Sequence, residues 1–98
     1  MPNIFEYLGI VILFYSDEHE PIHVHAVYGD STMNVSFFIR EGDIYRVTYA
    51  EIKGNFPPAK LKELKKFISV YKRDIVAAWD KYFIWKTKVD FVRITKKL

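Results

Sequence analysis

Cysteine is absent from the 98-residue chain, and glycine, proline and methionine are scarce, with four, four and two residues. The lack of cysteine excludes a disulfide scaffold, thiol chemistry and cysteine-bound zinc, so histidine and carboxylate remain as the strong metal ligands. The glycine-rich phosphate loops of kinases and dinucleotide-binding proteins are missing, as is the nucleophile elbow of serine hydrolases. The sequence therefore offers none of the short motifs that identify these enzyme classes.

Long hydrophobic runs are also lacking. The apolar run from Ile10 to Phe14 is too short to cross a bilayer, and no Lys or Arg precedes it as in a signal peptide. We therefore expect a cytoplasmic protein with no membrane contact. Aromatic residues, in contrast, make up 17% of the chain and hydrophobic residues 50%. This composition excludes disorder and predicts a single folded domain over residues 1–98.

The first half of the chain consists of short aromatic and β-branched runs separated by turn residues, a pattern typical of strands. The expected strands cover residues 3–7, 10–15, 22–28, 32–39 and 43–49. Their connections are too short for crossovers, so we predict an antiparallel β-meander. In the third strand, alternation places His23, His25 and Val27 on one face and Ile22, Val24, Ala26 and Tyr28 on the other.

The second half changes to helical periodicity. Apolar residues recur every three or four positions from Leu61 to Tyr82, which predicts a helix over about residues 58–83. A straight helix of that length would measure roughly 39 Å, so we expect it to bend, overhang or break, with Ser69 to Asp74 as the least supported stretch. Trp79, Tyr82, Phe83 and Trp85 are expected to pack where the helix meets the sheet.

A final strand over residues 89–95 is predicted to rejoin the sheet, and Lys96 to Leu98 to fray. One helix over an antiparallel sheet of about five or six strands buries both apolar surfaces. The expected fold class is therefore α+β. An overhanging amphipathic helix end would favour a dimer, because it would bury itself best against a second copy.

Charge is divided unevenly along the sequence. Residues 1–58 carry a net charge of −5 and residues 59–98 a net charge of +8. The predicted helix is rich in cations that surround its apolar stripe, namely Lys60, Lys62, Lys65, Lys66, Lys72 and Arg73. Such a surface is either a solvated helix face or a contact for a nucleic-acid backbone, for which Lys62, Lys65, Lys66, Lys72 and Arg73 are the candidates.

All three histidines fall within seven residues, at His19, His23 and His25, next to Asp17. Two imidazoles on one strand face can ligate one metal ion, with His19 and Asp17 as further ligands, and the set would suit zinc or manganese. Without a metal, the same imidazoles have the ordinary pKa for general acid and base catalysis on a phosphodiester. In the structural alternative, the histidines only pack within the loop and the strand and have no chemical role.

Three segments of the chain resemble one protein family. They are Met1-Pro2-x-Ile4-Phe5, then Phe14-Tyr15-Ser16-Asp17-Glu18-His19-x-Pro21-Ile22-His23-Val24-His25, and finally Pro58-x-Lys60-Leu61-x-x-Leu64 leading to Ala78-Trp79. Together they resemble the bacterial family called domain of unknown function 4160. The resemblance carries over Asp17, His19, Pro21, His23 and His25 as signature positions, without an established catalytic role. It implies a toxin-antitoxin-like pair of genes in which the neighbouring gene encodes a small partner protein.

The leading hypothesis is a component of such a two-gene module that binds the small partner protein and also nucleic acid, with the histidines as a ligand or metal site. A metal- or histidine-dependent phosphodiesterase or ribonuclease is the second hypothesis. In it, His23 and His25 hold the metal or move protons, and Asp17 and His19 orient them. A structural adaptor without chemistry is the third.

Overall fold

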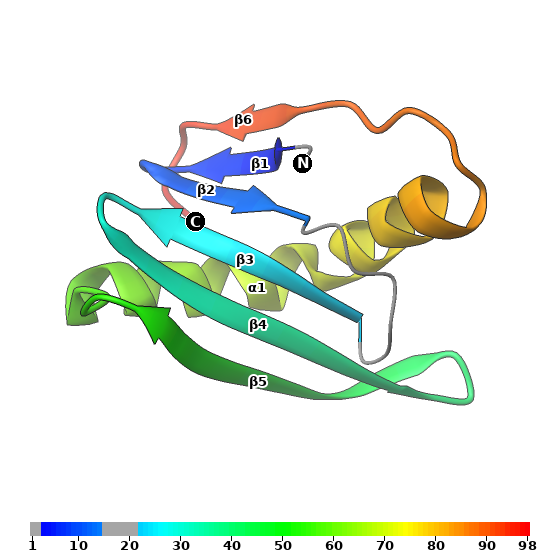
Figure 1. Cartoon of the computed structure of the whole chain (residues 1–98), viewed down its shortest axis with the longest axis horizontal. Helices are drawn as coiled ribbons and strands as arrows, with labels where there is room; N and C mark the ends of the chain where they lie inside the picture. Colours follow the sequence, from blue (N-terminus) through cyan, green and yellow to red (C-terminus); the bar gives the residue numbers. More distant parts are fainter. Residues whose placement is uncertain (1–2, 15–21) are drawn as a thin grey trace.

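The structure, a computed structural model, describes residues 3–14 and 22–98. Within these residues the chain forms five strands in succession, then a helix that ends in a π-helical turn, then a sixth strand (Figure 1). The elements are β1 (Asn3–Tyr7), β2 (Ile10–Leu13), β3 (Ile22–Tyr28), β4 (Ser31–Arg40), β5 (Asp43–Lys53), α1 (Pro58–Trp79), η1 (Asp80–Ile84) and β6 (Val92–Ile94).

The described strands form one sheet in the order β5-β4-β3-β2-β1-β6. The first five are antiparallel neighbours, which confirms the predicted meander and the α+β class. The last strand, β6, is shorter than the predicted strand over residues 89–95. It runs parallel to β1, whereas the other neighbouring strands are antiparallel. The reason is the crossover: α1 carries the chain from the β5 edge back beneath the sheet, and β6 then enters beside β1 in the same direction.

Tight turns produce the meander. The β1–β2 turn consists of Leu8 and Gly9, and the β4–β5 turn consists of Glu41 and Gly42. Both residues of each turn have positive φ, at +48° and +86° in the first turn and +53° and +82° in the second. This backbone matches the right-handed twist of the flanking strands and therefore fixes two-residue antiparallel hairpins. Glycine lowers the cost of the second turn position, because it has no Cβ to clash.

α1 covers one face of the sheet and buries Leu64, Phe67, Ile68, Ile75 and Trp79 against it. The Phe67 ring lies 5.5 Å from the Phe5 ring and 5.3 Å from the Tyr7 ring, so the helix packs on the central aromatic residues of β1. The contacts between aromatic rings and the apolar surface buried between helix and sheet make this layer the main source of stability.

The helix is continuous from Pro58 to Trp79, so of the expected outcomes, a bend, an overhang or a break, the break between Ser69 and Asp74 does not occur. Tyr71 stacks on Phe67 at 4.8 Å and contacts Phe5 at 5.7 Å, and Ile75 is buried, so the apolar stripe continues through that stretch. The fold also has room for the helix, because its longest dimension is 34 Å. The irregularity occurs later, where α1 changes into η1.

Lys60 anchors the start of α1 to the β1–β2 turn. Its Nζ donates hydrogen bonds to the Leu8 carbonyl oxygen and to Glu63 Oε1, both at 2.9 Å. The hydrogen bond to Glu63 is the main reason that the pKa of Lys60 is raised. The first turn of the helix is therefore fixed to the β1–β2 turn, next to the strand that the middle of the helix contacts.

The C-terminal residues Lys96 to Leu98 were expected to fray, but the last of them is held by a hydrogen bond. The Leu98 N–H donates a hydrogen bond to the Tyr7 hydroxyl at 3.0 Å, which holds the tail against β1. Within residues 3–14 and 22–98, no helix is long and apolar enough to cross a membrane.

Candidate functional site

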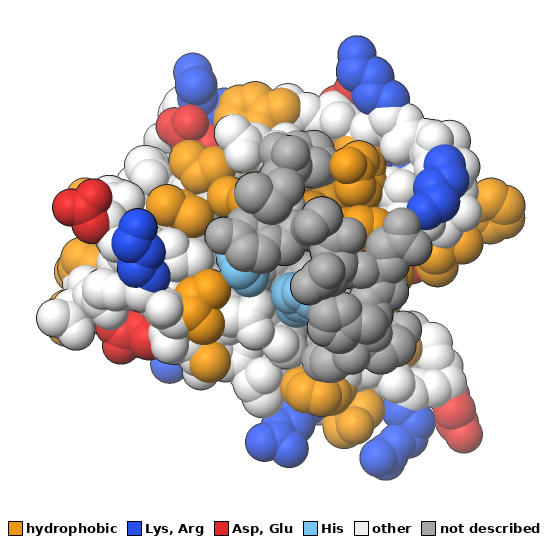
Figure 2. Space-filling model, in the orientation of Figure 1, with side chains coloured by type: hydrophobic (Ala, Val, Ile, Leu, Met, Phe, Trp, Pro, Cys, Tyr) orange, Lys and Arg blue, Asp and Glu red, His pale blue; other side chains and the backbone are white. Residues whose placement is uncertain are grey.

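His23 and His25 lie on the sheet face that points away from α1. Ile22, Val24 and Ala26, which alternate with them on β3, are buried in the core beneath the sheet. The predicted division of the third strand into two faces is therefore confirmed for these residues. Figure 2 shows both histidine surfaces, in pale blue, on the face turned away from the helix. Their ring centroids are 6.1 Å apart.

Polar side chains lie beside the histidine pair on one neighbouring strand, β4. In the β3–β4 register, Ser36 stands opposite His23 and Asn34 opposite His25. Asn34 Nδ2 donates to Ser36 Oγ at 3.4 Å, whereas the buried Asn34 Oδ1 has no hydrogen-bond partner among the described residues. The two histidines thus belong to a polar patch of four side chains, on a sheet whose other face is apolar.

The two imidazoles have different surroundings. His25 is 6% exposed, and its pKa is lowered first by burial and second by the charge of the neighbouring His23. Burial therefore favours the neutral form of the His25 imidazole, which is the form that ligates a metal or accepts a proton. Metal binding and general base catalysis both require this form, and both remain predictions.

The remaining members of the predicted histidine site, Asp17 and His19, lie outside the described residues, as does Pro21. Among the residues that the structure describes, no group of three or more His, Cys, Asp or Glu side chains could hold a metal ion. The four-residue metal site and the phosphodiesterase that would use it remain predictions.

The predicted nucleic-acid contacts lie on α1 but not on one surface. Lys62 and Lys66 line a groove with the C-terminal Lys97 and Leu98. Lys65 turns toward β5, where its Nζ lies 5.3 Å from the centre of the Tyr49 ring. Arg73 instead lines a second pocket of about 260 Å³ that also contains Asp43 and Asp80. Lys72 is half-buried.

The predicted packing of four aromatic residues where the helix meets the sheet is confirmed for three of them, Trp79, Tyr82 and Phe83. Trp79 and Phe83 are buried and their rings lie 4.8 Å apart, and Tyr82 packs against the core while partly exposed. Trp85, which was expected in the core, is 72% exposed, and the adjacent Ile84 is 60% exposed. The prediction fails at Trp85 because the helix ends in a π-helical turn that interrupts the α-helical period.

The end of η1 has a defined backbone geometry. The Trp85 N–H donates to the Asp80 carbonyl oxygen at 3.0 Å, five residues back, and the Thr87 N–H and Oγ1 both donate to the Lys81 carbonyl oxygen. Between these bonds, Lys86 has a φ of +56°, a left-handed conformation that is costly for a residue with a side chain. Trp85 is thus exposed on a hydrogen-bonded helix end.

The architecture defines a small α+β protein with a helix on one face of its sheet and a histidine pair on the other. The sequence profile of the family described as "Domain of unknown function (DUF4160)" matches residues 9–80, and the chain belongs to this family. The matched region includes His23, His25 and all of α1. No curated protein and no solved structure matches the chain.

Two features were missed by sequence reasoning. The groove includes Lys97 and Leu98, which the sequence places 31 residues or more beyond Lys66, and only the fold brings them together. The exposure of Trp85 depends on a single π-helical turn, for which the residue pattern from Asp80 to Ile84 gave no signal.

Proposed function

We propose that this protein is a binding protein that recognises a small partner protein through a surface formed by Ile84 and Trp85. The supporting observation is the exposure of two adjacent large apolar residues at a hydrogen-bonded helix end. Tryptophan is the residue most enriched at the energetic centre of protein interfaces. The partner is the small protein expected from the neighbouring gene of a toxin-antitoxin-like module.

The backbone of η1 supports this assignment in energetic terms. Ordering flexible side chains and loops during association reduces affinity. The bond from the Trp85 N–H to Asp80, together with the two bonds from Thr87 to Lys81, orders the helix end before any partner binds. A strained residue such as Lys86 persists where the surrounding structure holds it in place, and such residues cluster at functional positions.

The charge around this surface gives the chemistry of the partner. Lys81 and Lys88 are exposed and lie four and three residues from Trp85 along the chain. A partner with an apolar pocket and acidic groups at its rim would complement both the indole ring and these ammonium groups. Acidic groups at the rim would mainly accelerate association, whereas the indole would supply most of the affinity.

The test is co-expression of the chain with the product of the neighbouring gene, followed by affinity measurement on the purified proteins. Trp85→Ser is expected to weaken the complex about 30-fold, which corresponds to a typical hot-spot loss of about 2 kcal/mol. Val70→Ser is the matched control, because Val70 is also an exposed apolar residue but lies in the middle of α1. It is expected to leave the affinity unchanged.

The paired variant His23→Ala and His25→Ala separates this proposal from a histidine-centred function. If Ile84 and Trp85 form the interface, the complex survives the loss of both imidazoles, which lie on β3. Loss of the complex in the histidine variant, with full binding by Trp85→Ser, would contradict the proposal.

A further inference from the structure

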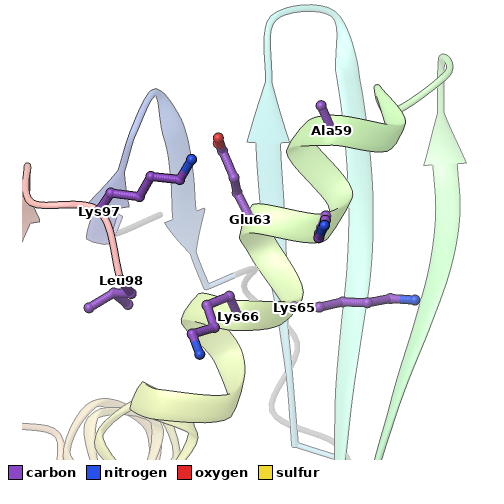
Figure 3. Close-up of a pocket in the computed structure, with 7 residues that line it drawn as sticks. Ala59, Glu63, Lys65, Lys66, Lys97 and Leu98 are labelled. Atoms are coloured by element: carbon purple, nitrogen blue, oxygen red, sulfur yellow. The ribbon is translucent and has the colours of Figure 1, made fainter.

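A groove of about 570 Å³ separates the first half of α1 from the C-terminal tail. One wall is formed by the helix residues Ala59, Lys62, Glu63 and Lys66, and the other by Lys97 and Leu98 (Figure 3). Lys65 also borders the groove, but Figure 3 shows its side chain directed away from the tail, toward β5. The groove therefore combines cations from two segments that are distant in the sequence.

The positive charge of the groove is not offset by an ion pair within the part of the chain that the structure describes. Glu63, the acidic residue of the lining, accepts a hydrogen bond from Lys60 Nζ at 2.9 Å and pairs with that lysine. Lys62, Lys66 and Lys97 are exposed, and none of them lies within ion-pair distance of a described carboxylate. Three ammonium groups thus face solvent around one concave surface.

The position of the tail is also fixed. The bond from the Leu98 N–H to the Tyr7 hydroxyl holds Leu98 at β1, and Tyr7 itself is buried and packs on Phe67 of α1. Both walls of the groove are therefore attached to the same aromatic layer. A ligand would meet a surface that exists before binding, which lowers the entropic cost of association.

We propose that this groove binds the phosphodiester backbone of a nucleic acid strand, with Lys62, Lys66 and Lys97 as the phosphate contacts. Lys62 and Lys66 lie one helical turn apart, so their Cα atoms are separated by about 6 Å along the axis. This separation suits successive phosphates, and lysine binds phosphate as a point charge. The aliphatic lysine stems and Leu98 give apolar surface against which sugar rings can pack.

A row of cations favours a nucleic acid over an acidic protein segment. Lys62 and Lys66 follow each other at one helical turn, and Lys97 adds a third cation from the opposite wall of the groove. A strand with regularly repeated charges can follow such a row, whereas an acidic protein patch has no regular repeat. This site lies on the helix layer, away from the histidine face, and its function is independent of the partner surface at Trp85.

Fluorescence anisotropy with a labelled 12-nucleotide single strand tests the proposal. Three phosphate contacts predict a slope of log affinity against log salt of about −2, so raising the salt from 50 to 200 mM lowers the affinity about 20-fold. In the double variant Lys66→Gln and Lys97→Gln, one contact remains and the same change in salt lowers the affinity only about threefold. A duplex of equal length determines whether one strand is sufficient.

Arg46→Gln together with Lys53→Gln is the matched control, because it removes the same charge from exposed cations of β5 that lie outside the groove. It is expected to leave the slope near −2. Equal weakening by the control and groove variants would show a diffuse effect of net charge and would overturn the proposal. Two other results would do the same: no binding of strand or duplex at 50 mM salt, and displacement of the bound strand by a polyglutamate peptide at a lower charge concentration than unlabelled strand.

Discussion

The two tryptophans give a direct test of the structure, because they are the same residue type in opposite surroundings. Trp79 is 4% exposed and lies 4.8 Å from the Phe83 ring, whereas Trp85 is 72% exposed. Replacing a buried tryptophan with alanine costs about 3–5 kcal/mol, because transfer energy is lost and a cavity remains. Replacing an exposed residue outside any packed contact changes stability by about 0.5 kcal/mol or less.

The loss expected for Trp79→Ala is large compared with the free energy of unfolding of the whole domain. A chain of 98 residues has a free energy of unfolding of about 5–15 kcal/mol, so Trp79→Ala removes a fifth of it at the least. For a domain of this size each kcal/mol shifts the Tm by about 4–8 °C. We therefore expect Trp79→Ala to lower the Tm by at least about 12 °C and Trp85→Ala by no more than about 4 °C.

Circular dichroism measures the change in Tm during heating and the change in the free energy of unfolding during urea titration, for both variants. If Trp79→Ala does not fold, Trp79→Phe keeps a ring in the core and is expected to give a smaller but clear loss. Trp79→Phe also leaves Trp85 as the sole tryptophan, and its emission is expected to resemble that of an indole in water both before and after unfolding. A stability loss above 2 kcal/mol for Trp85→Ala, or a blue-shifted emission from Trp85 alone, would refute the structure of the helix end.

Three further predictions concern the helix anchor and the histidine pair. Lys60→Met removes the bonds to Leu8 and Glu63 at a partly exposed position, and chemical unfolding is expected to show a loss of about 1 kcal/mol. The pKa of His25 is lower in the folded state than its ordinary value of about 6.5, so between these two pH values the unfolded state binds more protons. Stability therefore falls as the pH decreases through about 6.5, and it levels off below the folded-state pKa. His25→Gln should flatten this part of the stability profile, and an unchanged profile would assign the effect to other groups. Calorimetry with Zn²⁺ or Mn²⁺ should show no binding by the double variant His23→Ala and His25→Ala if the imidazoles are metal ligands, whereas unchanged affinity would exclude them.

The parts of the fold that follow from local patterns could be predicted from the sequence. Alternation in β3 placed His23 and His25 on the face opposite the core, and two-residue turns such as Leu8-Gly9 fixed the meander. Helical periodicity placed the start of α1 at Pro58, where a proline is compatible with the first turn. These features depend on neighbouring residues alone.

The parts that depend on distant contacts could not be predicted. Continuity of α1 across Ser69 to Asp74 depends on Tyr71 packing against Phe5 of β1, a contact that the sequence pattern does not show. The parallel direction of β6 follows from the crossover of the helix beneath the sheet. The tail position of Lys97 depends on the hydrogen bond between Leu98 and Tyr7, and so the lysine groove was also missed.

The same contacts couple the fold to the two proposed surfaces. Phe67 stacks on Tyr7, and Tyr7 accepts the hydrogen bond that holds Leu98, so the lysine groove depends on the middle of α1. Trp79 and Phe83 pack against each other in the core at the other end of the helix and hold η1, from which Trp85 extends. A substitution that loosens the Phe67 layer should therefore weaken phosphate binding more than partner binding, and one that loosens Trp79 should have the reverse effect. Measuring both affinities in a mild variant of each residue, Phe67→Leu and Trp79→Phe, would show whether one helix holds two separable binding surfaces.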